Sequence, residues 1–562
     1  RIEDSGGIEF PAAHGGHPCI RDRCVRGYPG QVSVAATGPS QDSDAPHSDS
    51  GASFALRYVI PGVVASVLIV LGSLGVGWLP LDSVLNGWPL VEALRGTTLG
   101  SIVSKGAVLV GVVLLLQSWL VLGFGVMHST VRSMKRLWIT LLAWAAPLML
   151  CLPLFSRDVY SYFAQGKLLV QDIDPYTKGV VELPGWFGTG ADPLWGESPA
   201  PYGPLFLLLE RGVAAFSNGD PLLGAYVFRI IAVLGVLLLA WSVPKLSFMH
   251  GISPPKAFWL VVLNPLVFMH FIIGVHNDAL MIGLIAAGFV LALERHPALG
   301  VMAVSLGAAV KPIGLLALPF LGIIWAGRTA TFGNRVSKWI LTLLIAIVTF
   351  VILSLISRTG IGWLGALATP GKVRTWLSPP TAIGMITGQL VKWIGIGTID
   401  FMVNVFRILG QLAALGLIAW LALKPYGRSA TRAAGVAFIA IVFLGPVVQP
   451  WYVLWGLPLV VAAGLTRNEL RVVLIGSAAF TVYGVATSSS TQDTLFELSD
   501  GIALLAVAVV IAILLLTSPR ERRLLLGAPE DEGLRPETPA ARARAAEQVV
   551  VGPGPSTSPD PV

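Results

Sequence analysis

Hydrophobic residues along this chain fall in long runs separated by short polar segments. Many of the runs are roughly 17 to 25 residues long, the length that a helix needs to cross about 30 Å of hydrocarbon. The pattern therefore predicts an all-α polytopic membrane protein with about 13 to 15 transmembrane helices. The candidate spans are approximately 57–80, 105–127, 136–155, 223–244, 256–274, 277–293, 298–310, 313–327, 338–357, 400–423, 432–448, 451–466, 471–488 and 501–517.

The composition excludes a soluble globular protein. The chain has 562 residues, of which 54% are hydrophobic and only 12% are charged, whereas soluble domains carry about 25% charged residues. Its 38 Lys and Arg against 31 Asp and Glu give a net charge of +7. These charges are spread over the connections between apolar runs, so no nucleic-acid partner is indicated.

Two polar tails flank the apolar part of the chain. Residues 1–54 are rich in Gly, Ser, Asp and Pro, and residues 519–562 are rich in Ala, Pro, Glu and Arg. Neither has the apolar periodicity that a folded domain requires. We expect two disordered cytoplasmic tails around one multi-span transmembrane domain, 55–518.

Basic residues indicate the orientation of the spans, because short cytoplasmic loops are rich in Lys and Arg. Placing every basic connection inside makes both termini cytoplasmic in the cell membrane. The long connections 156–222 and 358–399 then face outward. Their amphipathic or apolar segments, 159–170, 205–216 and 380–396, are expected to lie in the outer interface rather than cross.

Polar residues gather on this outer face, where their cost in apolar surroundings makes them functional candidates. They are Arg157, Asp158, Tyr160, Tyr162, Asp174, Tyr176, Tyr202, His276, Asn277, Asp278, Lys311, Arg374, Gln449, Trp451 and Tyr452.

Each group also has a purely structural explanation. Asp158 is either a general base or a cap for a helix starting at Val159. The segment 276–278 binds a polar ligand or caps the next span. Lys311, which precedes a proline between two short runs, holds an anionic phosphate or extends to the lipid headgroups. Trp451 and Tyr452 suit an aromatic belt, which does not explain Gln449.

A set of ordered motifs resembles a known family. The motifs are Ser156-Arg-Asp-Val-Tyr-Ser-Tyr, Asp174-Pro-Tyr, Tyr202-Gly-Pro, Asn264-Pro, His276-Asn-Asp-Ala-Leu, Lys311-Pro and Gln449-Pro-Trp-Tyr. Together, over about residues 150–455, they resemble the polyprenol-phosphate-mannose-dependent alpha-1,6-mannosyltransferases of actinobacterial lipomannan and lipoarabinomannan synthesis. These are multi-span glycosyltransferases of the GT-C class, which typically place an acidic residue in the first outer loop. Here that loop, 81–104, offers only Asp82 and Glu92, outside any matching motif.

The resemblance implies a polyprenyl phosphomannose donor lipid, a mannosylated lipid acceptor and an acidic base in an outer loop. We map the base to Asp158 and expect an inverting transfer to a mannoside 6-hydroxyl. We expect the donor phosphate at Lys311, Arg157 and Arg374. Sugar or acceptor contacts are expected at Tyr160, Tyr162, Asp174, Tyr176, Tyr202, His276, Asn277, Asp278, Gln449, Trp451 and Tyr452.

The sequence is also compatible with a metal site and with a second function. Asp158, Asp172 and Asp174 could meet around a divalent cation, although no spacing requires one and no cofactor is implied. A lipid-linked sugar transporter or flippase is the alternative function. Transporters commonly show internal repeats and bind near the midplane, whereas this chain shows no convincing repeat and its polar clusters lie toward one face.

Overall fold

Long apolar helices dominate the computed structural model, which describes residues 51–327, 329–366, 373–423 and 429–486. No strand occurs in this part of the chain. Among the described residues, five helical segments are long and apolar enough to cross a membrane. They are Gly51–Val76, which ends in α2 (Ile60–Val76), α4 (Thr98–Met127), α8 (Pro221–Met249), α13 (Phe332–Ser357) and α16 (Ile399–Leu423).

Shorter or broken helices occupy the remaining apolar runs. The π-helix η6 (Val267–Ile273) and α10 (Asp278–Leu293) meet at a bend of 113°, and together they would make a sixth span. The other helices of this group are α5 (Met134–Leu148), α9 (Pro254–Val261), α11 (Pro297–Val310), η7 (Pro312–Ala317), α12 (Leu318–Ala326), α17 (Ala430–Leu444), η9 (Pro450–Trp455), α18 (Leu457–Ala462) and α19 (Arg467–Ala486).

The all-α polytopic membrane fold is confirmed. Each predicted span up to residue 488 coincides largely with helix, but several of these helices are too short to cross alone. The run 501–517 lies outside the described residues. The expected number of spans therefore stays a prediction.

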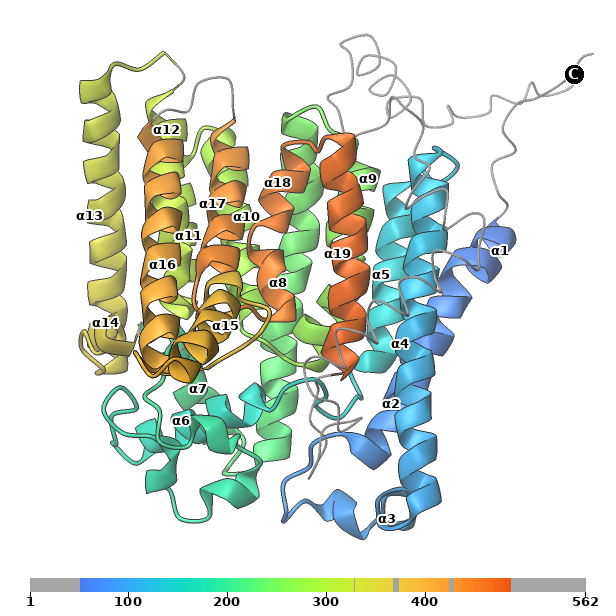
Figure 1. The fold of residues 1–562 in the computed structure, drawn as a ribbon. Coiled ribbons are helices and arrows are strands. Elements are labelled where there is room, and N and C mark those ends of the chain that lie inside the picture. The colour runs from blue at the N-terminus through green and yellow to red at the C-terminus, as the bar shows by residue number, and fades with distance from the viewer. Residues whose placement is uncertain (1–50, 328, 367–372, 424–428, 487–562) are drawn as a thin grey trace, which may run out of the picture. The chain divides into compact units, whose positions relative to one another are not determined.

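The helices of the long connections gather at one end of the bundle. Figure 1 shows α3 (Pro89–Gly96), α6 (Asp158–Val170), α7 (Pro204–Phe216), α14 (Trp363–Ala366) and α15 (Pro379–Trp393) at the lower end. The connections from α4 to α5, α8 to α9, α12 to α13 and α18 to α19 lie at the upper end. The two classes of connection that the charges distinguish are thus separated in space.

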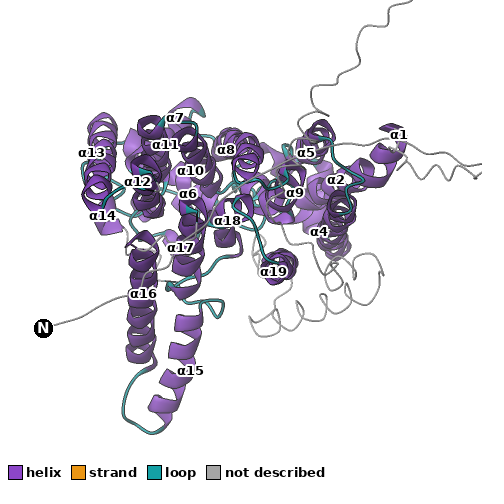
Figure 2. Cartoon of the chain, turned by 90° about the horizontal axis from the view of Figure 1, so that it is seen from above, coloured by secondary structure: helices purple, strands orange, loops and turns teal. Residues whose placement is uncertain are grey.

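The segments expected in the outer interface form helices, but α6 is largely covered by protein. It packs against α7 and α8, and α7 also contacts α11 and α13. Most α6 side chains are buried, including Tyr160 and Phe163. By contrast, α15 and α16 lie side by side and extend away from the other helices (Figure 2).

Two glycines allow α8 and α10 to approach closely. A Cβ atom added to Gly235 would lie 2.5 Å from the backbone of Ala279, and one added to Gly283 would lie 2.5 Å from the Gly235 carbonyl oxygen. Small residues commonly allow such close helix contacts in membranes. This contact fixes the start of α10, which carries Asp278.

We expect Gly235→Ala to lower stability by about 1 to 3 kcal/mol, because the added methyl group overpacks the contact. Thermal unfolding of the detergent-solubilised protein measures the effect. Gly476→Ala in α19 is the matched control, since nothing lies within 4 Å of its added Cβ atom. Equal melting temperatures for the two variants would contradict the close-contact argument.

Candidate active site

The N-terminus of α6 directs the Asp158 carboxylate away from the helix backbone. The Asp158 amide donates to Ser156 Oγ at 3.1 Å, and no side-chain cap is present at the start of α6. The Arg157 guanidinium donates to the carbonyl oxygens of Gly190 and Ala191 at 2.8 and 3.0 Å. Capping therefore does not explain Asp158, and the guanidinium of Arg157 serves to hold the loop in place.

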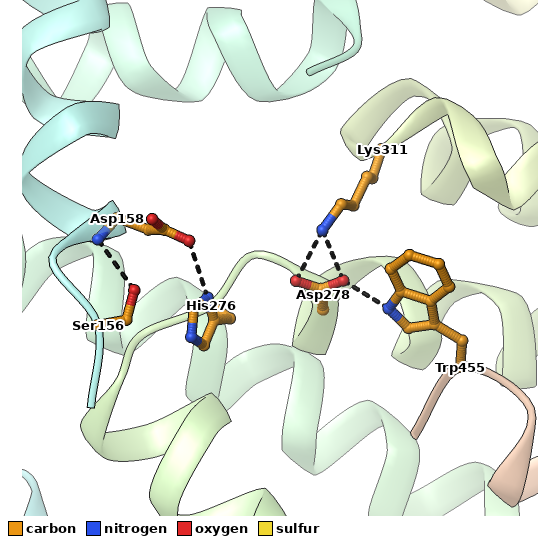
Figure 3. Close-up of polar contacts among 6 residues, drawn as sticks. All are labelled: Ser156, Asp158, His276, Asp278, Lys311 and Trp455. Carbon is orange, nitrogen blue, oxygen red and sulfur yellow. Dashed lines mark hydrogen bonds and ion pairs between the residues drawn. The ribbon is translucent and has the colours of Figure 1, made fainter. Parts of the chain in front are cut away.

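The Asp158 carboxylate meets a histidine from another part of the chain. Its Oδ2 lies 3.4 Å from His276 Nδ1 (Figure 3), and the Asp158 side chain is 22% exposed. Burial alone would raise the pKa of this carboxyl group. The His276 contact, the charge of Lys311 and the Trp195 indole outweigh burial and hold the pKa of Asp158 below its usual value. Asp158 is consequently ionised at neutral pH.

Lys311 lies at a break between helices. Helix α11 ends at Val310, Lys311 is extended (φ −140°, ψ 115°), and Pro312 begins the 3-10 helix η7. Proline cannot continue the hydrogen-bonding pattern of α11. The break presents the ammonium to Asp278, with Nζ 2.8 and 3.0 Å from the two carboxylate oxygens (Figure 3).

Asp278 is the shared partner of Lys311 and Trp455. The Trp455 indole donates to Asp278 Oδ1 at 2.6 Å. The Asp278 side chain is 1% exposed and that of Lys311 is 15% exposed. Because isolated buried charges are costly, both ionised groups depend on this pairing. Neither capping of α10 nor extension of Lys311 to the headgroups accounts for these contacts.

Aromatic rings line the same region. Tyr452 and Trp455 stack with centroids 4.1 Å apart, and Lys311 Nζ lies 5.0 and 5.2 Å from their respective centroids. Trp451 stacks on His276 at 3.8 Å. These contacts associate the aromatic segment with the polar cluster rather than with a lipid-facing belt.

Two cavities meet at Asp158. The first, here called the Lys311 cavity, has a volume of about 290 Å³, and its lining includes Ser161, Gln165, Tyr202 and Lys311. The second, here called the Gln449 cavity, has a volume of about 220 Å³, and its lining includes Arg157, Asp192, His270 and Gln449. Both cavities are lined by Asp158, Trp195, Val447, Trp451 and Tyr452.

Some residues that the sequence predicts as sugar or acceptor contacts pack next to the site but line neither cavity. They are Tyr160, Tyr162, Asp174 and Tyr176. The Tyr160 hydroxyl donates to the Trp78 carbonyl oxygen at 2.8 Å. The Tyr176 hydroxyl donates to the backbone carbonyl oxygen of Tyr202 at 2.8 Å. Asp174 Oδ1 accepts from the Tyr176 amide. Tyr162 packs edge-on against Tyr202 and two phenylalanines.

The structure does not bring Arg374 to Lys311. The Arg374 guanidinium pairs with Asp400, and both side chains are at least half exposed.

His276 and Asn277 are buried beside the site, and the Asn277 amide has no partner among the described residues. Asp278 is engaged by Lys311, so its carboxylate is not free for a sugar hydroxyl.

The three outer-face aspartates do not assemble a metal site. Within the described ranges, no group of three or more His, Cys, Asp and Glu could hold a metal ion. Asp172 is 84% exposed and lies 3.9 Å from Arg211.

The sequence prediction omitted Trp195, Ser161 and Gln165. Ser161 and Gln165 follow Asp158 at the spacing of one helix face, and this spacing could have identified them.

These features define a membrane protein whose described residues form helices around a charged site. Two family models match the chain: "Alpha-(1->6)-mannopyranosyltransferase, N-terminal domain" over residues 59–327 and "MptB C-terminal domain" over residues 380–517. The chain belongs to the alpha-(1->6)-mannopyranosyltransferase family.

Curated relatives cover most of the chain. A probable alpha-(1->6)-mannopyranosyltransferase of Mycolicibacterium smegmatis is 32% identical, over 85% of this chain and 91% of that protein. Alpha-(1->6)-mannopyranosyltransferase A of Mycobacterium tuberculosis is 34% identical, over 74% and 81%. Alpha-(1->6)-mannopyranosyltransferase B of Corynebacterium glutamicum is 30% identical, over 84% of each chain. No solved structure matches.

We expect Asp278→Leu to destabilise the protein by about 3 kcal/mol, because it leaves the Lys311 ammonium without its partner. Adding Lys311→Met should recover most of the loss, since the double variant buries no unpaired charge. Thermal unfolding of the single and double variants forms the cycle. Additive losses would contradict the coupling of the two residues.

Proposed function

We propose that the protein is an inverting glycosyltransferase that moves mannose from polyprenyl phosphomannose to the 6-hydroxyl of a mannoside, forming an alpha-1,6 linkage. One observation carries the proposal: the ionised Asp158 carboxylate and the Lys311 ammonium, remote in sequence, line one cavity. Family membership supports mannosyl transfer.

Lys311 binds the donor phosphate in this proposal. An ammonium group has three N–H donors, and Asp278 fixes its position with contacts at 2.8 and 3.0 Å. The Trp455 indole hydrogen-bonds to the same carboxylate and withdraws part of its negative charge. The ammonium can therefore stabilise the negative charge that develops on the leaving phosphate.

Asp158 is the general base. Its position at the junction of the two cavities suits an acceptor in the Gln449 cavity and a donor in the Lys311 cavity. The acceptor oxygen attacks the anomeric carbon while the carbon–phosphate oxygen bond breaks. The hydroxyl proton passes to Asp158, and the electron pair of the broken bond leaves with the lipid phosphate. Inversion at a β-mannosyl phosphate gives the α-linkage.

A low pKa at Asp158 is compatible with this role. Polyprenyl phosphate is a good leaving group, so the base is needed mainly once bond formation has made the attacking hydroxyl acidic. Positioning and charge stabilisation then supply much of the acceleration. A base that stays ionised at neutral pH is always ready to accept the proton.

The cellular assignment follows from the same proposal. The acceptor is a mannosylated lipid of lipomannan and lipoarabinomannan core synthesis. The site opens on the extracellular side of the cell membrane, where the donor enters laterally from the outer leaflet, and both termini are cytoplasmic. The separation of the two classes of connection in Figure 1 supports this orientation.

We expect Asp158→Asn to lower kcat by about 10² to 10⁴, the usual contribution of a general base, while donor affinity is retained. Lys311→Ala should instead raise the KM for donor as well as lower kcat. The assay follows transfer from radiolabelled polyprenyl phosphomannose to an oligomannoside by the purified protein.

Exposed residues of the same loop provide matched controls for this pair. They are Asp172→Asn and Lys178→Ala, whose side chains are 84% and 55% exposed. Near-normal turnover in Asp158→Asn would eliminate Asp158 as the base. Vectorial movement of intact donor lipid without any product would instead indicate a flippase.

The pH profile provides an independent measurement. Transfer requires ionised Asp158, so activity is lost as the pH falls through the pKa of this group. His276 lowers that pKa, and the wild-type loss should therefore occur at unusually low pH. His276→Phe keeps an aromatic ring beside Trp451 and should move the loss upward by about one pH unit.

His128→Phe is the control for this measurement, since His128 is exposed and lies at the far end of α4. If activity falls at the same acidic pH in wild type and His276→Phe, His276 is not the cause of the lowered pKa of Asp158.

A further inference from the structure

Helix α6 presents a stripe of polar side chains to the Lys311 cavity. Asp158, Ser161 and Gln165 all line this cavity. They are separated by three and four residues, which places them on one face of an α-helix. The Asp158 carboxylate is therefore the first group of a stripe that continues with Ser161 and Gln165.

Ser161 and Gln165 are buried, and each has an unpaired side-chain oxygen. Their side chains are 2% and 3% exposed. Ser161 Oγ and Gln165 Oε1 have no hydrogen-bond partner among the described residues. Buried polar atoms are normally paired, so two unpaired oxygen atoms along one cavity suit the binding of a polar ligand.

The spacing of the stripe suits a sugar. At 1.5 Å per residue, Ser161 lies about 4.5 Å and Gln165 about 10 Å along the helix from Asp158. A serine hydroxyl donates and accepts, and an amide oxygen accepts, so both can pair with hydroxyl groups. An isoprenoid chain offers no hydrogen bond to either.

Cavity membership distinguishes the donor sugar from the acceptor. Ser161, Gln165 and Lys311 line the Lys311 cavity, whereas none of them lines the Gln449 cavity. A sugar attached to a phosphate at Lys311 is therefore the one that faces the stripe.

We propose that Ser161 and Gln165 bind hydroxyl groups of the donor mannosyl residue and thereby set the selectivity for the donor sugar. The inference rests on the proposed function, because it takes the donor phosphate to bind at Lys311. Such a site rejects a donor that lacks the matching hydroxyl, since a buried polar group is then left unpaired.

The test measures kcat/KM with polyprenyl phosphomannose and with four analogues, each lacking the hydroxyl at C2, C3, C4 or C6 of the mannose. Gln165→Met and Ser161→Ala should each lower kcat/KM for the normal donor by about tenfold. The effect should appear in the donor KM, with the acceptor KM unchanged. Wild type should use one analogue with a low kcat/KM. For that analogue, removing the side chain that binds the missing hydroxyl should not lower kcat/KM further.

Gln171→Met is the matched control, because Gln171 is exposed just beyond the C-terminus of α6. Melting temperatures verify that the variants are folded. If Gln165→Met does not fold, Ser161→Ala carries the test, because it removes a single oxygen atom.

The outcomes separate this inference from the proposed function. Failure of the folded wild type to transfer mannose would overturn both. Normal transfer by wild type, with the same discrimination among all analogues in wild type and variants, would overturn only the role of Ser161 and Gln165. An increase confined to the acceptor KM would also overturn it.

Discussion

The ion pair between Lys311 and Asp278 is the interaction on which the geometry of the site depends. Each residue lies at a helix end: α10 begins at Asp278 after a bend of 113°, and α11 ends just before Lys311. The breaks in the helices at these two positions direct the two charged groups toward each other. Unbroken helices would not do so. The Trp455 indole attaches the η9 segment to the same carboxylate. Three separate segments thus converge on one buried negative charge.

This pairing also explains how a cation persists in an apolar surrounding before substrate arrives. Asp278 compensates the Lys311 charge, because an isolated buried ammonium would be costly. A phosphate group can then share the ammonium without a second cation. Asp158, across the same cavity, stays ionised through His276 and Lys311. In the proposed function, the site therefore holds a base and an anion-binding group along one cavity.

The sequence predicted the helices and the main polar residues for physical reasons, but it did not predict their pairing. Apolar runs specify helices in lipid, and Asp158 and Lys311 were identifiable because charges there are costly. The bond between Lys311 and Asp278 depends on two helix breaks whose geometry periodicity does not encode. Arg374 had the right charge but pairs with Asp400. Tyr160 resembled a cavity residue in sequence, whereas its hydroxyl is bound to a backbone carbonyl in the core.

The proposed function requires the donor phosphate to bind at Lys311 with its sugar toward Asp158. An experimental structure with a non-hydrolysable phosphonate analogue of polyprenyl phosphomannose tests it most directly. We expect a phosphonate oxygen within about 3 Å of Lys311 Nζ and the anomeric carbon on the side facing Asp158. A phosphonate bound at Arg157 or Arg374, with the Lys311 cavity filled by protein or lipid, would contradict it.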